Sequence, residues 1–378
     1  MRPALLPSVV AAPPHPLAAA RAVAERFALP GPMAQLEPLG QGNVNSTYLV
    51  TLAGAEPLRF VLQRLNTRVF PHPDRVMGNI ARVSEHLAAS DAARSAGWRV
   101  PRLMLACHNQ QPWLVDDAGQ PWRLMTYLEE CHCPQTIATV DEAREVARGL
   151  ASFLRFLHDL PVDQLADTLE GFHVTPRYLQ AFEGVLQHMK RPLDQHEQEA
   201  VTFVQARAAT ASVLEDARRR GELQDRPIHG DPKVNNVLLC RHSGRAVALI
   251  DLDTVKPGLL HYDIGDCLRS ACNPLGEETD DLDGVVCDLE RLEAMLEVLL
   301  SELRPVLTAA DHAYLFDAIR LLPYELGLRF LTDHLAGDRY FRTERPGQNL
   351  QRALVQLRLS ASIEAQEPAI RTLLKELA

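Results

Sequence analysis

Long apolar runs, basic clusters and aromatic side chains are all scarce in this chain of 378 residues. No apolar stretch approaches the ~20 residues that a membrane-spanning helix needs, so we expect no membrane span. Apart from Arg218–Arg220, the Lys and Arg residues form no run, and the formal net charge is −10. The chain therefore lacks the basic face typical of nucleic-acid binding, and its acidity argues against an anionic membrane surface. Aromatic residues make up only 6%, which predicts a mainly aliphatic core.

Paired cysteines are also missing. The seven cysteines, an odd number, stand at positions 107, 131, 133, 240, 267, 272 and 287 without regular spacing. This pattern predicts reduced thiols and a cytoplasmic protein. The apolar stretch Ala4–Ala12 follows Arg2 as in a signal peptide, but prolines interrupt it and no clear cleavage site follows. We interpret residues 1–16 as a loose N-terminal arm.

The hydrophobic pattern changes near residue 130, where β-type runs give way to helical periodicity. Before that point, one helix is expected at Asp74–Ala89. Five strands are expected there, at Tyr48–Leu52, Arg59–Gln63, Val100–Leu105, Pro112–Val115 and Trp122–Tyr127. After it, apolar stripes predict helices at Asp141–His158 and Gly284–Leu303, and a hairpin joins Asn236–Leu239 to Val247–Ile250. The pattern predicts an α+β fold of two lobes: residues 17–128 form a β-rich nucleotide-binding lobe, and residues 129–378 a mainly helical lobe. The ligand cleft is expected between them.

The strongest chemical signal is the segment from His229 to Asn236, followed by Asp251. It matches the H-x-D-x4-N catalytic loop of phosphoryl-transfer enzymes and the later carboxylate of their metal site. Asp231 would align the acceptor hydroxyl and receive its proton, while Asn236 and Asp251 offer the hard oxygen ligands that Mg²⁺ prefers. Taken singly, Asp231 also suits a helix N-cap and Asp251 a solvated strand end. Their order and spacing together favour a bilobal, protein-kinase-like phosphotransferase that uses ATP and Mg²⁺.

A glycine-containing loop lies upstream, where a phosphate-covering loop is expected. Glycines let backbone N–H groups approach phosphate oxygens closely. The loop lacks a Walker A lysine and is followed by a strand and not by a helix; taken alone, it would equally suit a hairpin turn. The next strand also lacks the usual lysine, so Arg64 is our candidate cation, with Glu85 as its possible partner. Both also suit a surface salt bridge. The expected nucleotide-binding residues are Gly40, Gly42, Asn43, Asn45, Thr47 and Arg64, with Thr126, Tyr127 and Leu128 in the linker.

These motifs resemble the aminoglycoside phosphotransferase and choline kinase superfamily, and within it the N-acetylhexosamine 1-kinases. The resemblance spans nearly the whole chain after about residue 35. Besides the catalytic loop, it is carried by Ile250–Gly258, Tyr262–Asp266 and the late stretch from Leu328 to Leu350. It implies that Asp231 is the catalytic base, that Asn236 and Asp251 hold the metal, and that Asp253 assists them. It further implies an acceptor pocket formed by Lys233, Thr254, Arg329 and Tyr340.

The pocket residues also make chemical sense, because arginine offers planar paired donors and tyrosine an aromatic face for a sugar. Helix packing or a surface ion pair would explain Arg329 and Tyr340 equally well. Gly230 matches the aminoglycoside kinases at this position, whereas the hexosamine kinases carry a larger residue, so it bears on the identity of the acceptor and not on the reaction.

Several alternatives therefore stay open. The acceptor could be an aminoglycoside, choline, homoserine or another sugar such as N-acetylmuramate. The acids Glu277, Glu278, Asp280, Asp281 and Asp283 could line a pocket for a polycation, although a solvated loop explains them more simply. A catalytically inactive nucleotide-binding regulator is the alternative outside enzymes. The missing strand lysine hints at it, and the retained Asp231, Asn236 and Asp251 argue against it. The oligomeric state is not indicated.

Overall fold

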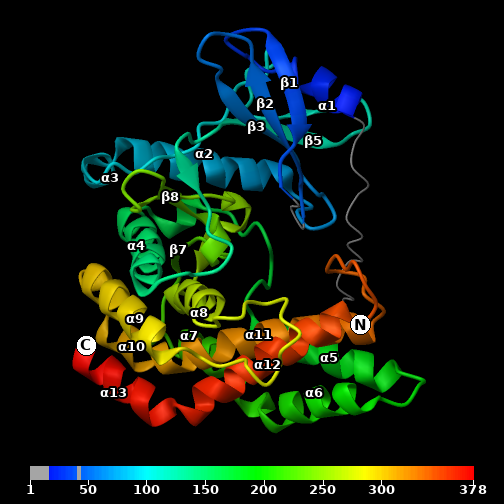
Figure 1. The fold of residues 1–378 in the computed structure, drawn as a ribbon, viewed down its shortest axis with the longest axis vertical. Helices are drawn as coiled ribbons and strands as arrows, with labels where there is room; N and C mark the ends of the chain where they lie inside the picture. Colours follow the sequence, from blue (N-terminus) through cyan, green and yellow to red (C-terminus); the bar gives the residue numbers. More distant parts are fainter. Residues whose placement is uncertain (1–16, 41–43) are drawn as a thin grey trace.

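A five-stranded antiparallel sheet forms the N-terminal lobe, with the strand order β1-β2-β3-β5-β4 (Figure 1). The structure, a computed structural model, describes residues 17–40 and 44–378, so the expected arm at 1–16 lies outside it. The strands are β1 (Met33–Pro38), β2 (Ser46–Leu52), β3 (Arg59–Arg64), β4 (Leu114–Val115) and β5 (Pro121–Thr126). Helix α1 (Leu17–Ala24) shares the hydrophobic core of this lobe.

Strand alternation gives the sheet two different faces. On β3 and β5, Leu62, Trp122 and Leu124 are fully buried in the core that the sheet shares with α1. Gln63 and Arg123, which lie opposite each other in the β3–β5 ladder, point to the other face. Because Arg123 reaches Asp253 of the C-terminal lobe, this second face is the one turned towards the cleft.

In this lobe one strand prediction was wrong and one strand was not predicted. Val100–Leu105 is not a strand: it makes only an isolated bridge between Leu103 and Met125, and Pro101 has no N–H to donate. Strand β1 was not expected, because its sequence, MAQLEP, is mostly polar. As an edge strand it has no buried residue, so no hydrophobic alternation marks it.

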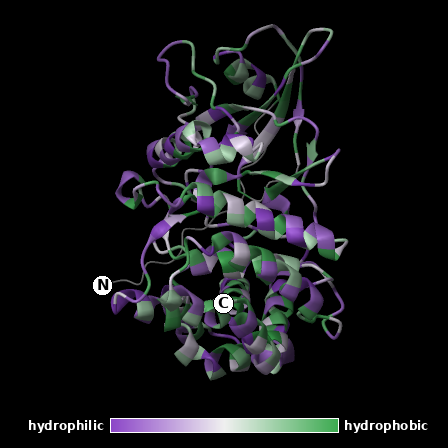
Figure 2. Ribbon diagram, turned by 90° about the vertical axis from the view of Figure 1, so that its left-hand side faces the viewer, coloured by the Kyte–Doolittle hydropathy of each residue, from purple (hydrophilic) through white to green (hydrophobic). Residues whose placement is uncertain are grey.

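The C-terminal lobe consists mainly of helices whose apolar faces meet in one large core. They are α4 (Val140–Phe156), α5 (Thr175–His188), α6 (Gln195–Ala206), α7 (Val213–Arg219), α8 (Leu260–Ala271), α9 (Leu289–Leu303), α10 (Ala309–Ala313), α11 (Leu315–Leu335), α12 (Gln348–Ala365) and α13 (Glu367–Leu377). The predicted stripe of α4, including Val146, Leu150 and Phe153, is completely buried. In Figure 2 hydrophobic and hydrophilic residues occupy different faces of these helices. The predicted α+β fold, a β-rich lobe joined to a mainly helical one, is confirmed.

Helix α9 begins later than expected, at Leu289 and not at Gly284. The Asp288 side chain accepts a hydrogen bond of 3.2 Å from the Arg291 N–H, so Asp288 is the N-cap. None of the described helices is long and apolar enough to cross a membrane.

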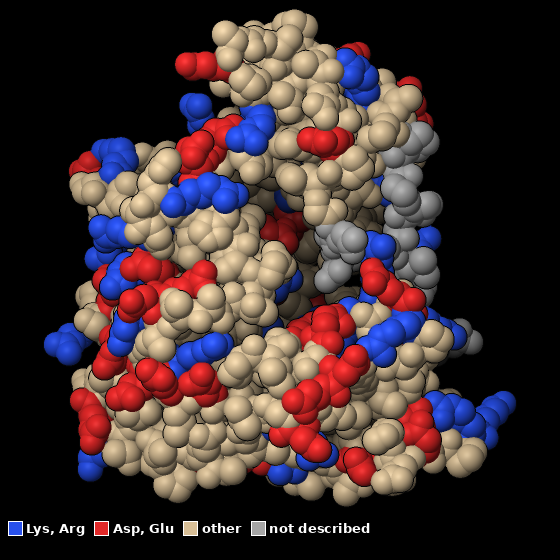
Figure 3. Space-filling model, viewed as in Figure 1, with Lys and Arg blue, Asp and Glu red and all other residues tan. Residues whose placement is uncertain are grey.

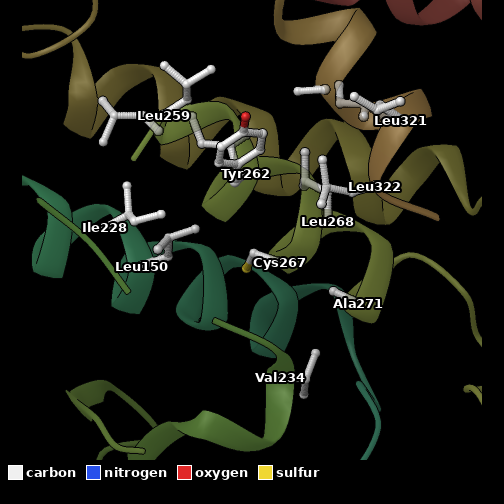
Figure 4. Packing of buried hydrophobic residues seen from close by; sticks show 14 of the residues in the cluster. Leu150, Ile228, Val234, Leu259, Tyr262, Cys267, Leu268, Ala271, Leu321 and Leu322 are labelled. Carbon is white, nitrogen blue, oxygen red and sulfur yellow. The ribbon is translucent and has the colours of Figure 1, made fainter. Parts of the chain in front are cut away.

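Helix α8 lies at the centre of the C-terminal lobe. Figure 4 shows Cys267, Leu268 and Ala271 of α8 among Leu150 of α4 and Leu322 of α11. Helices α8 and α11 approach each other closely at Gly265, where an added Cβ would come within 2.7 Å of the Ala318 carbonyl oxygen. This central helix carries polar side chains, Asp263 and Ser270, that bind the backbone of the catalytic loop.

Helix α2 (Pro73–Ala89), followed by the short α3 (Asp91–Ser95), lies between the sheet and the helical lobe (Figure 1). The buried face of α2, including Val76, Ile80 and Val83, joins the core of the C-terminal lobe. The Asn79 side chain also donates 2.8 Å hydrogen bonds to the carbonyl oxygens of Ala166 and Val255. Although α2 precedes residue 128 in the chain, its packing belongs to the helical lobe.

Short strands beneath the cleft complete the fold. Strands β6 (Cys131–His132), β8 (Val237–Cys240) and β9 (Ala246–Leu249) form a three-stranded sheet that contains the predicted hairpin. Strands β7 (Arg226–Ile228) and β10 (Lys256–Gly258) form a two-stranded ladder. The catalytic loop follows β7, and the Asp251 turn connects β9 with β10, so these small sheets bring the two motifs together.

Candidate active site

The catalytic loop leaves β7 in a conformation that depends on Gly230. This glycine has a φ of +85°, and an added Cβ would lie 2.6 Å from the Thr254 carbonyl oxygen. Asp263 of α8 accepts hydrogen bonds from the N–H groups of His229 and Gly230, at 2.7 and 2.8 Å. The Thr254 hydroxyl donates to the His229 carbonyl oxygen at 2.8 Å. The backbone just before Asp231 is therefore held from two sides.

His229 connects the catalytic loop to the strand that carries Asp251. Its Nδ1 accepts from the Asp231 N–H at 3.3 Å, and its Nε2 lies 2.9 Å from the Ile250 carbonyl oxygen, which can only accept. One accepting and one donating nitrogen require the neutral ring. Burial lowers the pKa of His229 to about 4, in agreement with this hydrogen bonding.

Asp231, Asn236 and Lys233 form a contiguous polar group. The Asn236 Nδ2 donates to the Asp231 backbone oxygen at 2.7 Å and lies 3.3 Å from its carboxylate. The Lys233 ammonium lies 3.0 Å from the same carboxylate, and this neighbour raises the pKa of Lys233. The Asp231 carboxylate is thus oriented by two side chains of its own loop.

Asp251 lies next to the polar group formed by Asp231, Asn236 and Lys233. The Ile250 N–H donates to the Asn236 carbonyl oxygen at 2.9 Å, which places Asp251 beside the catalytic loop. Asp251 has a left-handed φ of 64°, and its side chain is open to solvent. Enclosure by the cleft, together with the carboxylates of Asp253 and Asp231, raises its pKa to about 6.

The Asp251 carboxylate and the Asn236 Oδ1 have no hydrogen-bond partner in the described chain. Two neighbouring oxygen ligands that are free and accessible fit Mg²⁺, which keeps several waters and binds few protein groups. Asp253 differs, because it is 2% exposed and its carboxylate accepts from Arg123 and Asn45. Its expected share in the metal site stays a prediction, and this pairing does not support it.

The linker between the lobes leaves part of its backbone free. Thr126 and Tyr127 use their N–H groups on the Arg102 and Arg59 carbonyl oxygens. The N–H and C=O of Leu128, by contrast, bond to no residue that the structure describes. The Leu128 side chain packs with Leu238 beneath the cleft. A planar base that stacks on these side chains could pair with the free linker groups.

The predicted phosphate loop is described only in part. Gly42 and Asn43 lie outside the described residues, whereas Gly40 has a φ of 67°. The Thr47 hydroxyl accepts from Gln63 at 3.1 Å on the cleft face of the sheet. Asn45 is buried, and its side chain binds Asp253 and the Asn66 N–H.

Arg64 lies on the sheet face opposite to Gln63, 8% exposed and 3.2 Å from the Ser46 hydroxyl. Glu85 is exposed on α2 and makes no ion pair with Arg64. The role expected for Arg64 at the phosphates stays a prediction, and the structure gives the cleft-facing position of β3 to Gln63.

A cavity of about 180 Å³ opens beside Asp231. All the residues expected in the acceptor pocket line it, namely Lys233, Thr254, Arg329 and Tyr340. Figure 3 shows the molecule hollowed between its two lobes, with acidic side chains inside the hollow. The structure therefore brings the predicted base and the predicted acceptor residues to one cavity, although they come from three separate parts of the chain.

Arg329 of α11 is enclosed by aromatic rings. Its guanidinium carbon lies 5.0–5.9 Å from the ring centres of four side chains, which are Phe172, Tyr178, Tyr340 and Phe341. No ion pair or hydrogen bond joins Arg329 to another residue in the described chain. Its donors are therefore held in place by the rings and available to a ligand in the cavity.

The carboxylates that line the cavity all have basic partners. The pairs are Asp231 with Lys233, Asp266 and Glu277 with Arg269, and Glu325 with His173, at 2.8–3.3 Å. Glu278, also considered as a pocket acid, is bound by Arg352. Arg329 and Arg342 line the same cavity without an acidic partner among the described residues. The cavity thus has an excess of positive charge.

Comparison with known proteins shows which protein family this chain belongs to. Residues 35–284 match the model of the phosphotransferase enzyme family known as APH, which is well over half of the chain. The chain belongs to this family. The expectation of a small-molecule kinase is thereby confirmed, while the finer assignment to N-acetylhexosamine kinases is not.

Solved structures share the fold of this kinase at low sequence identity. An aminoglycoside phosphotransferase from Alicyclobacillus acidocaldarius is 18% identical, with a TM-score of 0.63 over 97% of this chain and 98% of its own. A microcompartment-associated aminopropanol kinase is also 18% identical, with a TM-score of 0.62 over 93% and 97%. Aminoglycoside 2'-phosphotransferase-IIIa, solved as a GDP complex, is 16% identical, with a TM-score of 0.53 over 89% and 94%. These similarities show that the chain shares the fold of small-molecule kinases.

Sequence reasoning missed two groups in the kinase that position the site. Arg123 lies in a strand whose apolar neighbours dominate the pattern, and only its ion pair across the cleft distinguishes it. His173 lies in a loop with a left-handed φ of 63°, 2.8 Å from Glu325 and 2.7 Å from the Gly230 carbonyl oxygen. Burial alone would lower the pKa of His173, but the Glu325 carboxylate raises it. No local sequence pattern links residues so far apart.

Proposed function

We propose that this phosphotransferase transfers the γ-phosphate of ATP to a sugar hydroxyl, the anomeric hydroxyl of an N-acetylhexosamine such as N-acetylglucosamine or N-acetylgalactosamine. The reaction forms a bond between the acceptor oxygen and the γ-phosphorus and breaks the bond from that phosphorus to ADP. Catalysis of such a transfer depends mostly on positioning and on neutralising charge. The cytoplasm is the proposed location, and the seven free thiols support it.

The residues at the cavity divide these tasks. Asp231 orients the acceptor hydroxyl and receives its proton, while Lys233, 3.0 Å from that carboxylate, faces the transferred phosphate. Asn236 and Asp251 would hold Mg²⁺, which neutralises charge on the phosphates when bound. The glycine loop, with Gly40 and Thr47, covers the phosphates, and the free backbone groups of Leu128 receive the adenine.

The charge of the acceptor cavity is the observation that favours a sugar over a cationic acceptor. A polycationic aminoglycoside or an amino alcohol needs carboxylates that are free to bind ammonium groups. Here each lining carboxylate is already paired, and Arg329 offers unpaired donors beside the rings of Tyr340 and Phe172. Planar donors and aromatic faces suit the carbonyl, hydroxyl and ring surfaces of a neutral acetamido sugar.

A panel of acceptors tests the proposal. ADP release is measured with N-acetylglucosamine, N-acetylgalactosamine, N-acetylmuramate, kanamycin, choline and homoserine, each against a control without acceptor. We expect turnover with the first two and none with the cationic acceptors. Because a phosphate on the anomeric oxygen removes the reducing end, a reducing-sugar assay on the product identifies the hydroxyl. Turnover with kanamycin or choline alone would refute the sugar assignment, and no turnover with any acceptor would favour the inactive regulator.

A further inference from the structure

The kinase lacks the lysine that phosphoryl-transfer enzymes of this plan carry on the third strand. At the cleft-facing position of β3 stands Gln63, a neutral side chain. The basic residue nearest to it on that face is its cross-strand partner Arg123 on β5. The Arg123 Nε and Nη2 donate to the Gln63 Oε1 at 2.9 and 2.6 Å, so the two side chains form one unit.

The Arg123 guanidinium extends across the cleft to the Asp253 carboxylate. The two side chains are 1% and 3% exposed, so the ion pair is removed from solvent. The other carboxylate oxygen of Asp253 accepts from Asn45 at 2.6 Å, and Asn45 follows the glycine loop. Two parts of the N-terminal lobe, Asn45 and β5, thus bind one acid of the C-terminal lobe directly, and Gln63 of β3 joins them through Arg123.

Asp253 also belongs to the turn that presents the candidate metal ligand Asp251. The Thr168 hydroxyl donates to the Asp253 backbone oxygen at 3.2 Å and supports the turn from below. Because this turn lies between Asp251 and Thr254, a shift of Asp253 would displace a metal ligand and a wall of the acceptor cavity together. The ion pair therefore sets the position of the sheet relative to the turn.

We propose that Arg123 is the positioning residue that replaces the strand lysine: its buried pair with Asp253 holds Asn45, just before β2, and the Asp251 turn in register for the nucleotide phosphates. Arg123 is covered on all sides, so it acts through Asp253 and Gln63 and does not touch a phosphate. This inference rests on the proposed nucleotide site. It is independent of the acceptor, because the cavity lining does not include Arg123.

The first experiment measures the affinity of ADP with Mg²⁺ by calorimetry, without any acceptor, in the wild type and in Arg123→Met. We expect a loss of affinity of at least tenfold in the variant, and a smaller loss in Arg123→Lys, which keeps the charge. Arg207→Met is the matched control, since Arg207 forms an ion pair with Glu364 between helices remote from the cleft. The control should bind ADP like the wild type.

A double variant that moves the positive charge to another residue distinguishes a charge-dependent role of Arg123 from a role in packing alone. In the double variant Gln63→Lys with Arg123→Met, the charge moves to the facing strand position and can still reach Asp253. We expect most of the lost ADP affinity to return. Loss without recovery in a double variant that folds, or wild-type affinity in Arg123→Met, would overturn the proposal.

If Arg123→Met does not fold, Asp253→Asn decides the question. This change keeps a side chain of the same shape that can bond to Asn45 and removes the charge partner of Arg123. This variant is measured with ADP alone, without Mg²⁺, so that a lost metal ligand cannot explain the result. An affinity loss of at least tenfold then supports the proposal, and unchanged affinity refutes it. Absence of turnover with every sugar, with these ADP results intact, would instead count against the proposed function.

Discussion

Replacing Gly230 with alanine tests the geometry of the catalytic loop. Gly230 has a φ of +85°, a conformation that costs an L-residue about 1–2 kcal/mol. Its new Cβ would also lie 2.6 Å from the carbonyl oxygen and 3.0 Å from the Cβ of Thr254, closer than real Cβ contacts. Overpacking of this kind adds about 1–3 kcal/mol. We therefore expect the free energy of unfolding to fall by roughly 3 kcal/mol.

The same change should impair catalysis, because Asp231 is the next residue. If the loop moves to relieve the contact with Thr254, the Asp231 carboxylate moves with it. A displacement of about 1 Å at a reacting group lowers turnover by roughly 100-fold. Steady-state kinetics with the best acceptor of the panel would give kcat, and urea unfolding would give the stability.

Gly244→Ala is the matched control. Gly244, in the turn between β8 and β9, has a φ of +70° but no atom within 4 Å of the added Cβ. It should show only the cost of the conformation, about 1–2 kcal/mol, and normal turnover. If Gly230→Ala equals Gly244→Ala in both stability and kcat, the close approach of Gly230 to Thr254 does not exist and the reasoning fails.

Three further predictions concern the proposed base Asp231, the ring-enclosed Arg329 and the Arg191–Glu197 ion pair. Asp231→Asn should lower kcat by about 10²–10⁴-fold and leave ADP affinity within twofold, and near-normal turnover would exclude Asp231 as the base. Arg329→Met should raise the acceptor KM about 10-fold or more, because charge-assisted hydrogen bonds to the acceptor are lost, and should leave the ATP KM unchanged. Arg320→Met on the same helix is the control. An equal rise of the acceptor KM in the control would contradict the assignment of Arg329. The hydrogen-bonded Arg191 guanidinium lowers the pKa of Glu197 from 4.5 to about 2, so the stability from Glu197 is complete above pH 4.5 and is lost as the pH falls towards 2. Unfolding of Glu197→Gln should therefore show a loss on the order of 2 kcal/mol at pH 7 that shrinks with acid, and a pH-independent difference would show that the carboxylate is not the cause.

The proximity of Asp231, Asn236 and Asp251 could be predicted because these residues are close together in the chain. Asp231 and Asn236 share one loop, and Asp251 follows the next hairpin, so spacing alone indicated their meeting. The acceptor residues Arg329 and Tyr340 were named from a family resemblance. Only the packing of α11 against α8 shows how these two residues come to line a cavity with Asp231.

The missed features are those without a local signal. The edge strand β1 buries nothing, so its polar sequence does not look like a strand. Alternation along β3 does not tell which face meets the cleft, and only the structure shows that Gln63 is the residue turned to the C-terminal lobe. The apolar stripe of α2 predicted a helix correctly, but not that its face packs into the core of the other lobe.

The amino-acid order by itself predicted the chemistry proposed for this kinase: a base, two oxygen ligands for a metal and a glycine-containing loop for phosphates, each indicated by residue type and spacing. Tertiary structure alone decided which charges are neutralised. Arg123 pairs with Asp253, and Arg329 lies against the rings of Phe172 and Tyr178, because chain segments more than a hundred residues apart pack together. Pairing energies depend on distance and burial, and a sequence specifies neither until it has folded.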